Sequence, residues 1–206
     1  MNKITSVMKR PVCPSCDFPV TTCVCSYLSQ PLNNHIEVVI LQHPSETKVA
    51  KNTAKLLTLQ LQHIQLVVGE TAADFSAVQS YLANRKAALL YPNKHAQTLA
   101  AGAAEKLELD TIIILDGTWK KATRLYQSNH WLHDLPSFSF ATHDQSLYTI
   151  RKSKHEFSLS TLEACARFLE LVEGCDVTSL LTLQQGMVEQ QMKFMTPDVR
   201  SRYQNK

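Results

Sequence analysis

The stretch Thr111-Ile-Ile-Ile-Leu-Asp116-Gly-Thr-Trp119-Lys-Lys-Ala-Thr-Arg124-Leu-Tyr126 contains an apolar run followed by a mixed polar and apolar pattern. Its apolar, β-branched run stops abruptly at Asp116 and Gly117, which is typical of a buried parallel strand. A helical pattern follows, and Thr118 is expected to cap that helix by accepting a hydrogen bond from a backbone amide. Because open α/β sheets bind ligands at the carboxyl ends of their strands, we predict a functional site at this junction.

The helix that begins near Trp119 separates its residues by chemistry. One stripe is expected to face inward and consists of Trp119, Ala122 and Tyr126. The basic residues gather on another side, and these are Lys120, Lys121 and Arg124. An acid beside a cationic face favours chemistry on an anionic partner. The alternative is a purely structural role, because an aspartate after a strand is often only a helix cap and basic residues often form a solvated face.

Length and composition favour a single α/β domain with a small appendage. The chain has 206 residues and is 44% hydrophobic, which is enough for a sizeable core. No apolar run approaches the roughly 20 residues that cross a bilayer, and residues 1–10 lack the apolar segment of a signal peptide. We therefore expect a soluble cytoplasmic protein with no membrane partner. The formal charge of +3 is a mild basic bias, so the clustering of lysine and arginine matters more than their sum.

Glycine is scarce, and its placement excludes two kinds of nucleotide site. The five glycines are Gly69, Gly102, Gly117, Gly174 and Gly186. None is spaced as G-x-G-x-x-G or G-x-x-x-x-G-K-[ST], the patterns that let the backbone approach phosphate in Rossmann and P-loop sites. Any cofactor that this sheet binds therefore uses other loops.

A cysteine cluster lies near the N-terminus and holds four of the six cysteines: Cys13, Cys16, Cys23 and Cys25. In a reducing cytosol such clustering favours a metal over disulfides. Cys13 and Cys16 have the knuckle spacing of zinc sites, and the second pair can complete a tetrahedron of four thiolates. We predict a structural zinc ion, because four thiolates leave no open position for a substrate; redox-active or incidental thiols are the alternative. Cys165 and Cys175 are expected to be small buried residues.

Strand and helix patterns alternate along the rest of the chain. Strands are predicted at residues 36–41, 63–68, 87–91, 111–115 and, less regularly, 137–140. Helices are predicted from Ser45 or Thr47 to about 61, and at 74–85, 96–107, 158–173 and 178–192, with Ser160 and Glu163 at capping-box spacing. The alternation implies an α/β fold with a mostly parallel sheet and helices on both faces. We divide the chain into a four-cysteine zinc-binding segment, residues 1–30, and a catalytic domain, residues 31–206.

Several of these motifs together resemble the DTW domain family. Asp116-Gly-Thr118-Trp119 is similar to the family's Asp-x-Thr-Trp signature, and the run from Arg10 to Cys25 is similar to its N-terminal zinc motif. Three further blocks fit the family pattern: His43-Pro44-x-Glu46 with Asn52-Thr53, Leu90-Tyr91-Pro92, and Tyr148-x-Ile150-Arg151-Lys152 with Leu159-Ser160-Thr161-x-Glu163. The resemblance covers the chain from about Arg10 to Glu173, and only the C-terminal tail departs from it.

This resemblance implies a function and a fold. The family resembles bacterial tRNA-uridine aminocarboxypropyltransferases, which implies transfer of the 3-amino-3-carboxypropyl group of S-adenosylmethionine to N3 of a tRNA uridine at position 47. The by-product would be 5′-methylthioadenosine. The implied fold is similar to SPOUT methyltransferases, and we expect a monomer or weak homodimer. Two alternatives remain: a methyltransferase that uses the same cofactor and releases S-adenosylhomocysteine, and a zinc-ribbon RNA-binding protein without catalysis.

The implied chemistry assigns roles to particular residues. Asp116 is the candidate base for the uridine N3 proton, a kind of help that is typically worth ~10²–10⁴-fold in rate. Arg151 and the backbone amides near Ser160 and Thr161 are candidates for the methionyl carboxylate, and Trp119 for stacking on adenine or uracil. The signature adds Thr118 as a catalytic residue, and further cofactor contacts are expected at Pro44, Asn52, Thr53, Leu90, Tyr91, Pro92, Leu115, Gly117 and Leu159. The tRNA is expected to dock on Lys120, Lys121, Arg124, Arg151, Lys152 and Lys154.

Overall fold

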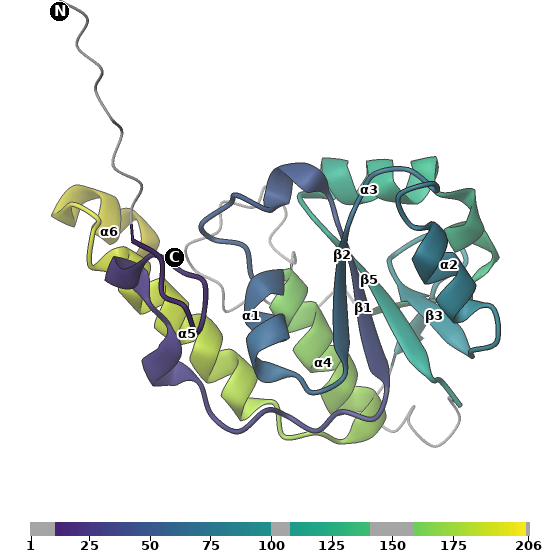
Figure 1. The fold of residues 1–206 in the computed structure, drawn as a ribbon, viewed down its shortest axis with the longest axis horizontal. Coiled ribbons are helices and arrows are strands. Elements are labelled where there is room, and N and C mark those ends of the chain that lie inside the picture. The colour runs from purple at the N-terminus through teal and green to yellow at the C-terminus, as the bar shows by residue number, and fades with distance from the viewer. Residues whose placement is uncertain (1–10, 100–107, 141–158, 205–206) are drawn as a thin grey trace, which may run out of the picture.

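The computed structural model of the chain describes residues 11–99, 108–140 and 159–204. Within these ranges one six-stranded sheet has the order β2-β1-β5-β3-β6-β4, and every neighbouring pair is parallel (Figure 1). The strands are β1 (Glu37–Gln42), β2 (Ile64–Val68), β3 (Ala87–Leu90), β4 (Gln97–Leu99), β5 (Thr111–Asp116) and β6 (Ser137–Phe140). The predicted parallel α/β sheet is confirmed.

Helices cover both faces of the sheet. The helices α1 (Ala54–Gln60), α4 (Thr161–Glu173) and α5 (Thr178–Met192) lie on one face, whereas α2 (Ser76–Leu82) and α3 (Trp119–Ser128) lie on the other (Figure 1). Successive side chains of β1 pack into the cores on opposite faces of the sheet. Val38 and Ile40 pack against the face covered by α1, α4 and α5, and Val39 and Leu41 against the face covered by α2 and α3. Because β1 and β5 are buried on both sides, their sequences are almost wholly apolar.

The C-terminal helices agree closely with the prediction. At the start of α4, the Ser160 hydroxyl accepts a hydrogen bond from the Glu163 amide at 3.2 Å, and the Glu163 carboxylate accepts one from the Ser160 amide at 2.8 Å. This is the predicted capping box. The helix ends at Gly174, whose φ of 66° lies in the left-handed region that glycine tolerates. The next helix, α5, matches the predicted range of 178–192, and α6 (Pro197–Gln204) follows it.

Three helix predictions need correction. The helix expected from Ser45 or Thr47 begins only at Ala54, after the short 3-10 helix η3 (Pro44–Glu46), because the Asn52 side chain starts it by accepting from the Lys55 amide at 3.2 Å. The helix expected at 74–85 is shorter, since Asp74 instead accepts from the amides of the preceding turn. The helix expected at 96–107 does not begin at its predicted start, because Gln97–Leu99 form strand β4 on β6; residues 100–107 lie outside the described ranges.

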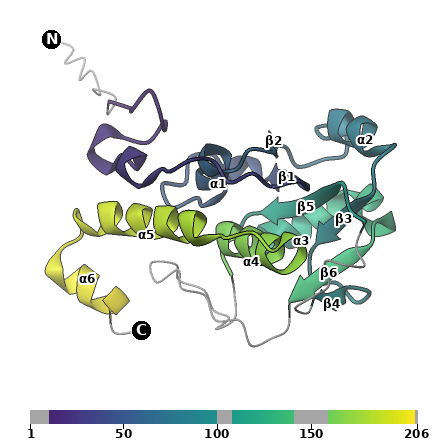
Figure 2. The same cartoon turned by 90° about the horizontal axis from the view of Figure 1, so that it is seen from below.

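The cysteine-containing segment lies alongside α5 (Figure 2). It contains two 3-10 helices, η1 (Val20–Thr22) and η2 (Cys25–Tyr27). The Tyr27 ring covers Gly186, where a Cβ atom would lie only 2.2 Å from the ring, and the Tyr27 hydroxyl donates to Glu189 at 3.0 Å. Phe18 and Val24 join the same core cluster as α4 and α5. The segment therefore contributes to the main core, and its separation as residues 1–30 stays a prediction.

The contact between Tyr27 and Gly186 predicts an unusual stability effect. Alanine in place of a helical glycine normally stabilises a helix by about 1 kcal/mol, but here the added methyl group collides with the Tyr27 ring, whose hydroxyl is hydrogen-bonded to Glu189. We expect Gly186→Ala to lower the free energy of unfolding by about 1–2 kcal/mol, as measured by urea denaturation. Gln185→Ala, at the exposed neighbouring position, is the matched control and should change little. A Gly186→Ala variant more stable than the parent would contradict the contact.

Candidate active site

The sheet has its topological switch point between β1 and β5. These strands are hydrogen-bonded neighbours, yet the chain leaves β1 toward α1 on one face and leaves β5 toward α3 on the other. Ligands of open α/β sheets bind at such a point, outside the carboxyl ends of the strands. Gln42 and Asp116 are the last residues of the two strands and are partners in their register.

The Asp116 carboxylate lies at the centre of this region and is only 3% exposed. Its Oδ2 atom accepts hydrogen bonds from Gln42 Nε2 at 2.9 Å and from Asn52 Nδ2 at 2.7 Å. Its Oδ1 atom accepts from the Thr161 hydroxyl at 2.5 Å. Burying a carboxylate costs several kcal/mol unless its oxygens are satisfied, and these three donors supply that compensation.

These bonds join Asp116, at the end of β5, to three other segments, each at least 45 positions away from it in the sequence. The donors come from the end of β1, the loop before α1 and the first residue of α4. A second set of contacts fixes the start of α4: the Thr53 hydroxyl accepts from the Leu162 amide at 3.3 Å, and Gln184 donates to Ser160 at 3.1 Å. Because the side chains are held by packed elements on several sides, the site is preorganised.

The start of α3 differs from its prediction in two respects. Thr118 occupies the N-cap position, as expected, but its side chain makes no capping hydrogen bond. Trp119 was predicted to face inward, yet it is 41% exposed, and the buried residues of α3 are Ala122 and Leu125. The helix begins directly at the sheet edge, so its first residue extends beyond the core. Gly117 permits this tight start, because a Cβ atom there would lie 2.9 Å from Lys121 Cβ.

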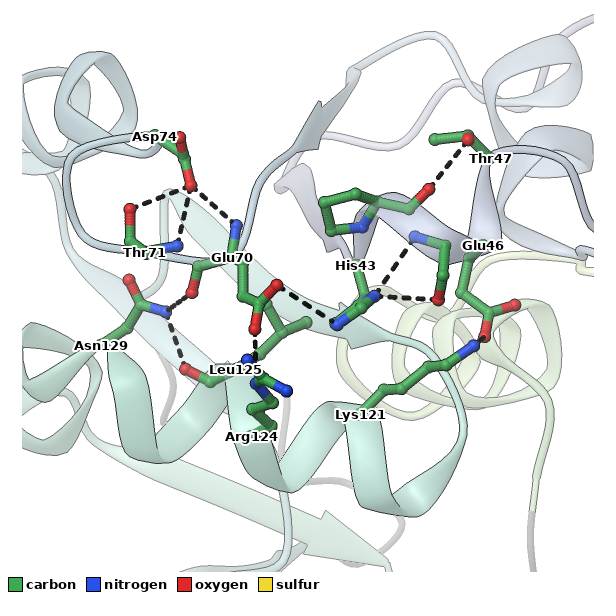
Figure 3. Close-up of polar contacts among 12 residues, drawn as sticks. His43, Glu46, Thr47, Glu70, Thr71, Asp74, Lys121, Arg124, Leu125 and Asn129 are labelled. Carbon is green, nitrogen blue, oxygen red and sulfur yellow. Dashed lines mark hydrogen bonds and ion pairs between the residues drawn. The ribbon is translucent and has the colours of Figure 1, made fainter.

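Two of the three predicted RNA-binding residues on α3 are held in ion pairs (Figure 3). Lys121 Nζ lies 2.7 Å from Glu46 Oε1, and Glu46 is itself buried at 7% exposure. Arg124 pairs with Glu70, whose carboxylate also lies 3.7 Å from His43 Nε2. Lys120 is exposed. These pairs tie the loops after β1 and β2 to α3 and neutralise part of the cationic face. The other predicted residues, Arg151, Lys152 and Lys154, lie outside the described ranges.

The remaining predicted cofactor residues surround the carboxyl ends of the three central strands. Tyr91 follows β3, and its ring centroid lies 6.5 Å from that of Trp119. Leu90 ends β3, and Leu115 is the second-last residue of β5. Their side chains are buried in opposite cores, so only their backbone atoms face the strand ends. Pro44 begins η3, Pro92 is exposed after β3, and Leu159 precedes α4.

Sequence reasoning missed Gln42, His43, Glu46 and Glu70 as members of the site. Gln42 was detectable in principle: it directly follows a buried apolar run, as Asp116 does, and parallel neighbours align their strand ends. Glu46 is marked only by the His43-Pro44-x-Glu46 block that fits the family pattern, and Glu70 carries no signal in the sequence. Their importance comes from pairing with residues 75 and 54 positions away in the sequence, which local patterns do not reveal.

The four clustered cysteines form a candidate metal centre. Their sulfur atoms all lie within 4.8 Å of one another, with 3.7 Å between Cys13 and Cys25 and between Cys16 and Cys23. A tetrahedral zinc ion with Zn–S bonds of about 2.3 Å requires sulfurs about 3.8 Å apart, so the arrangement fits. A left-handed Asp17, with φ of 54°, turns the chain between the two pairs.

The thiols influence one another in this cluster. Backbone amides of Cys16 and Ser15 lower the pKa of the Cys13 thiol to about 6, whereas the Cys23 and Cys16 sulfurs raise the pKa of Cys25 to about 12. Sulfurs this close cannot all carry negative charge without a cation. The donor set therefore suits a thiophilic divalent ion. Cys165 is fully buried, as predicted, whereas Cys175 is only half-buried, which differs from the prediction.

These features define a class: an α/β protein with a parallel sheet, a buried aspartate at its switch point and a four-cysteine cluster packed against its C-terminal helices. The chain belongs to the DTW domain family, which matches residues 10–192.

Relatives of the chain carry names that describe an activity. It is 32% identical over 178 residues to tRNA-uridine aminocarboxypropyltransferase 2 of Drosophila melanogaster, covering 81% of this chain and 68% of that protein. It is 30% identical to the protein of the same name from Macaca fascicularis, covering 80% of this chain and 57% of the relative. It is 25% identical to tRNA-uridine aminocarboxypropyltransferase A of Arabidopsis thaliana, over 92% of this chain and 84% of that protein. By name these relatives are transferases. No solved structure matches the chain.

None of the helices in the described ranges combines the length and the apolar character that a bilayer crossing requires.

Proposed function

We propose that this protein transfers the 3-amino-3-carboxypropyl group of S-adenosylmethionine to N3 of a tRNA uridine, at position 47, and releases 5′-methylthioadenosine. The names of the relatives support a tRNA-uridine substrate and this group. The parallel sheet with a site at its strand ends is compatible with a SPOUT-like arrangement. The metal in the four-cysteine cluster is a structural zinc ion, because four sulfur ligands leave no position for substrate.

The observation that carries the proposal is the hydrogen bond between Asp116 and Thr161. The uridine N3–H is weakly acidic and must lose its proton to become a nucleophile. Asp116 is too buried to contact the uracil ring directly. The Thr161 hydroxyl is half-buried and donates a hydrogen bond to Asp116 Oδ1 at 2.5 Å. The N3 proton passes to Thr161 Oγ1 as the Thr161 proton passes to the Asp116 carboxylate. Thr161 thus links a buried base to the substrate.

The described residues also suit the cofactor. S-adenosylmethionine, when bound, supplies an electrophilic Cγ next to its sulfonium. Trp119, 41% exposed beside the site, offers a flat surface for adenine or uracil. The N-terminus of α4, at Ser160 and Thr161, is the positive end of a 13-residue helix and stabilises a carboxylate. Asn52 and Thr53 hold the loop that faces this helix end.

The by-product distinguishes this function from its alternatives. The purified protein is incubated with S-adenosylmethionine and an unmodified tRNA transcript, and small molecules are analysed by mass spectrometry. We expect one 5′-methylthioadenosine per modified uridine, and none with a transcript that has cytidine at position 47. Formation of S-adenosylhomocysteine would instead identify a methyltransferase. Binding of tRNA without any consumption of cofactor would identify a non-catalytic RNA-binding protein.

A further inference from the structure

A row of aromatic rings extends from the candidate site along α3. The Tyr91 ring lies between Trp119, at 6.5 Å between centroids, and Tyr126, at 4.7 Å with a stacked geometry. The row continues from Tyr126 to His133 at 4.3 Å, and from His133 to His130 at 5.3 Å. We call these five residues the aromatic row. They come from three segments: the end of β3, helix α3 and the 3-10 helix η5 (His130–Asp134).

Hydrogen bonds fix the rings of the row in place. The Tyr91 hydroxyl donates to Thr123 at 3.2 Å, and Asn93 Nδ2 donates to the Tyr126 hydroxyl at 3.3 Å. His133 Nε2 lies 2.9 Å from the Tyr126 carbonyl oxygen, so its N–H tautomer donates to that atom. Rings that are already ordered lose little conformational entropy when a ligand binds on them.

The row is accessible and its surroundings are mainly basic. Trp119, His130 and His133 are exposed, and Tyr91 and Tyr126 are half-buried. Exposed cations border it: Lys120 beside Trp119, and Lys94 in the loop after Asn93. Asp134 is the acid next to His133. Flat rings among positive charges are the features with which proteins bind single-stranded nucleic acid, by base stacking and phosphate attraction.

We propose that the aromatic row binds unpaired nucleotides of the tRNA substrate next to the target uridine. This inference rests on the proposed function for the identity of the RNA. The row begins at Trp119, the first residue of α3, and α3 starts directly after the strand that ends at Asp116, the partner of Thr161. A strand of RNA with its uridine at Thr161 therefore has the row next to it. Helix α3 rises about 1.5 Å per residue, which makes the row long enough for more than one base. Stacking requires bases that are not already in a duplex, so the row selects a looped region.

The test measures the affinity of a fluorescently labelled, unmodified tRNA transcript by anisotropy at several salt concentrations. Tyr126→Leu keeps apolar packing but removes a ring, and we expect a loss of about 5- to 150-fold. Tyr126→Phe keeps the ring and should bind like the parent protein. His133→Ser should also weaken binding. Tyr81→Leu is the matched control: Tyr81 packs against the same core from α2 and has no ring contact with the row, so its loss should not affect tRNA binding.

Salt dependence separates stacking from charge. Tyr126→Leu should leave the slope of log affinity against log salt unchanged, whereas Lys120→Gln should reduce it by about 0.7–0.9, the contribution of one phosphate contact. Affinity for S-adenosylmethionine, measured by calorimetry, should not change in either variant. Circular dichroism confirms that each variant is folded.

The outcomes separate the row from the proposed function. Unchanged tRNA affinity in folded Tyr126→Leu and His133→Ser variants would overturn the proposed RNA-binding role of the aromatic row, even if the parent protein performs the transfer. A loss of affinity accompanied by a flatter salt slope would also overturn it, because the row would then act through charge. If the parent protein transfers no group but the ring variants still lose RNA affinity, the row stands and the proposed function fails.

Discussion

Asp116→Asn is expected to lower the rate of transfer by ~10²-fold or more, with little change in affinity for cofactor or tRNA. The structure explains why this variant is informative. Its side-chain carbonyl can still accept from Gln42 and Asn52, while its amide group donates to the Thr161 oxygen. The packing is kept, but the direction of the hydrogen bond with Thr161 is reversed. The asparagine amide cannot accept the proton that Thr161 would pass on from uridine N3. Single-turnover assays with excess enzyme measure the chemical step directly.

Thr161 provides the companion variants. Thr161→Val removes the hydroxyl while Asp116 stays intact, and we expect a loss of similar size; Thr161→Ser should keep most of the activity. The double variant, Asp116→Asn with Thr161→Val, should be no slower than either single one, because residues that act as one unit are not additive. Near-normal turnover by the Asp116→Asn variant would assign Asp116 a purely structural role.

Cys16→Ser is expected to abolish metal binding and to unfold residues 11–30. A structural zinc ion contributes ~10–16 kcal/mol to the folding of a small metal-binding segment, and Cys16 is fully buried in the shared core. The metal content is measured by elemental mass spectrometry, and the loss of structure by hydrogen exchange of residues 11–30.

The matched control for the metal site is Cys175→Ser, a half-buried cysteine outside the cluster. It should retain one zinc ion per chain. Unfolding of this segment removes Phe18 and Val24 from the main core. We therefore expect the Cys16→Ser variant also to have a lower melting temperature for the whole protein. A parent protein without zinc, in which all four clustered thiols react freely while the fold persists, would contradict the metal site.

The sheet could be predicted from the sequence because its central strands are unambiguous. The β-branched runs of β1 and β5 end at polar residues and match the structure within one residue at each end. The start of the helix predicted at 96–107 was wrong, because residues 97–99 are held as strand β4 by pairing with β6, about 40 positions away, which local helix propensity does not reveal.

The site was predictable in part for the same reason. Asn52, Asp116 and Thr161 were expected as site residues, and the structure brings them into one hydrogen-bonded cluster. Trp119 was misplaced because a helical wheel does not say where the sheet edge ends. The acids that pair with Lys121 and Arg124 come from other loops, so the sequence of α3 alone overstated its cationic face.

The most direct test of the central claim is nucleoside mass spectrometry of tRNA from cells that lack the gene. The account predicts that 3-(3-amino-3-carboxypropyl)uridine disappears from position 47, returns with the parent protein, and does not return with the Asp116→Asn variant. An unchanged amount of this nucleoside in the deletion strain would contradict the account, as would its full restoration by the Asp116→Asn variant.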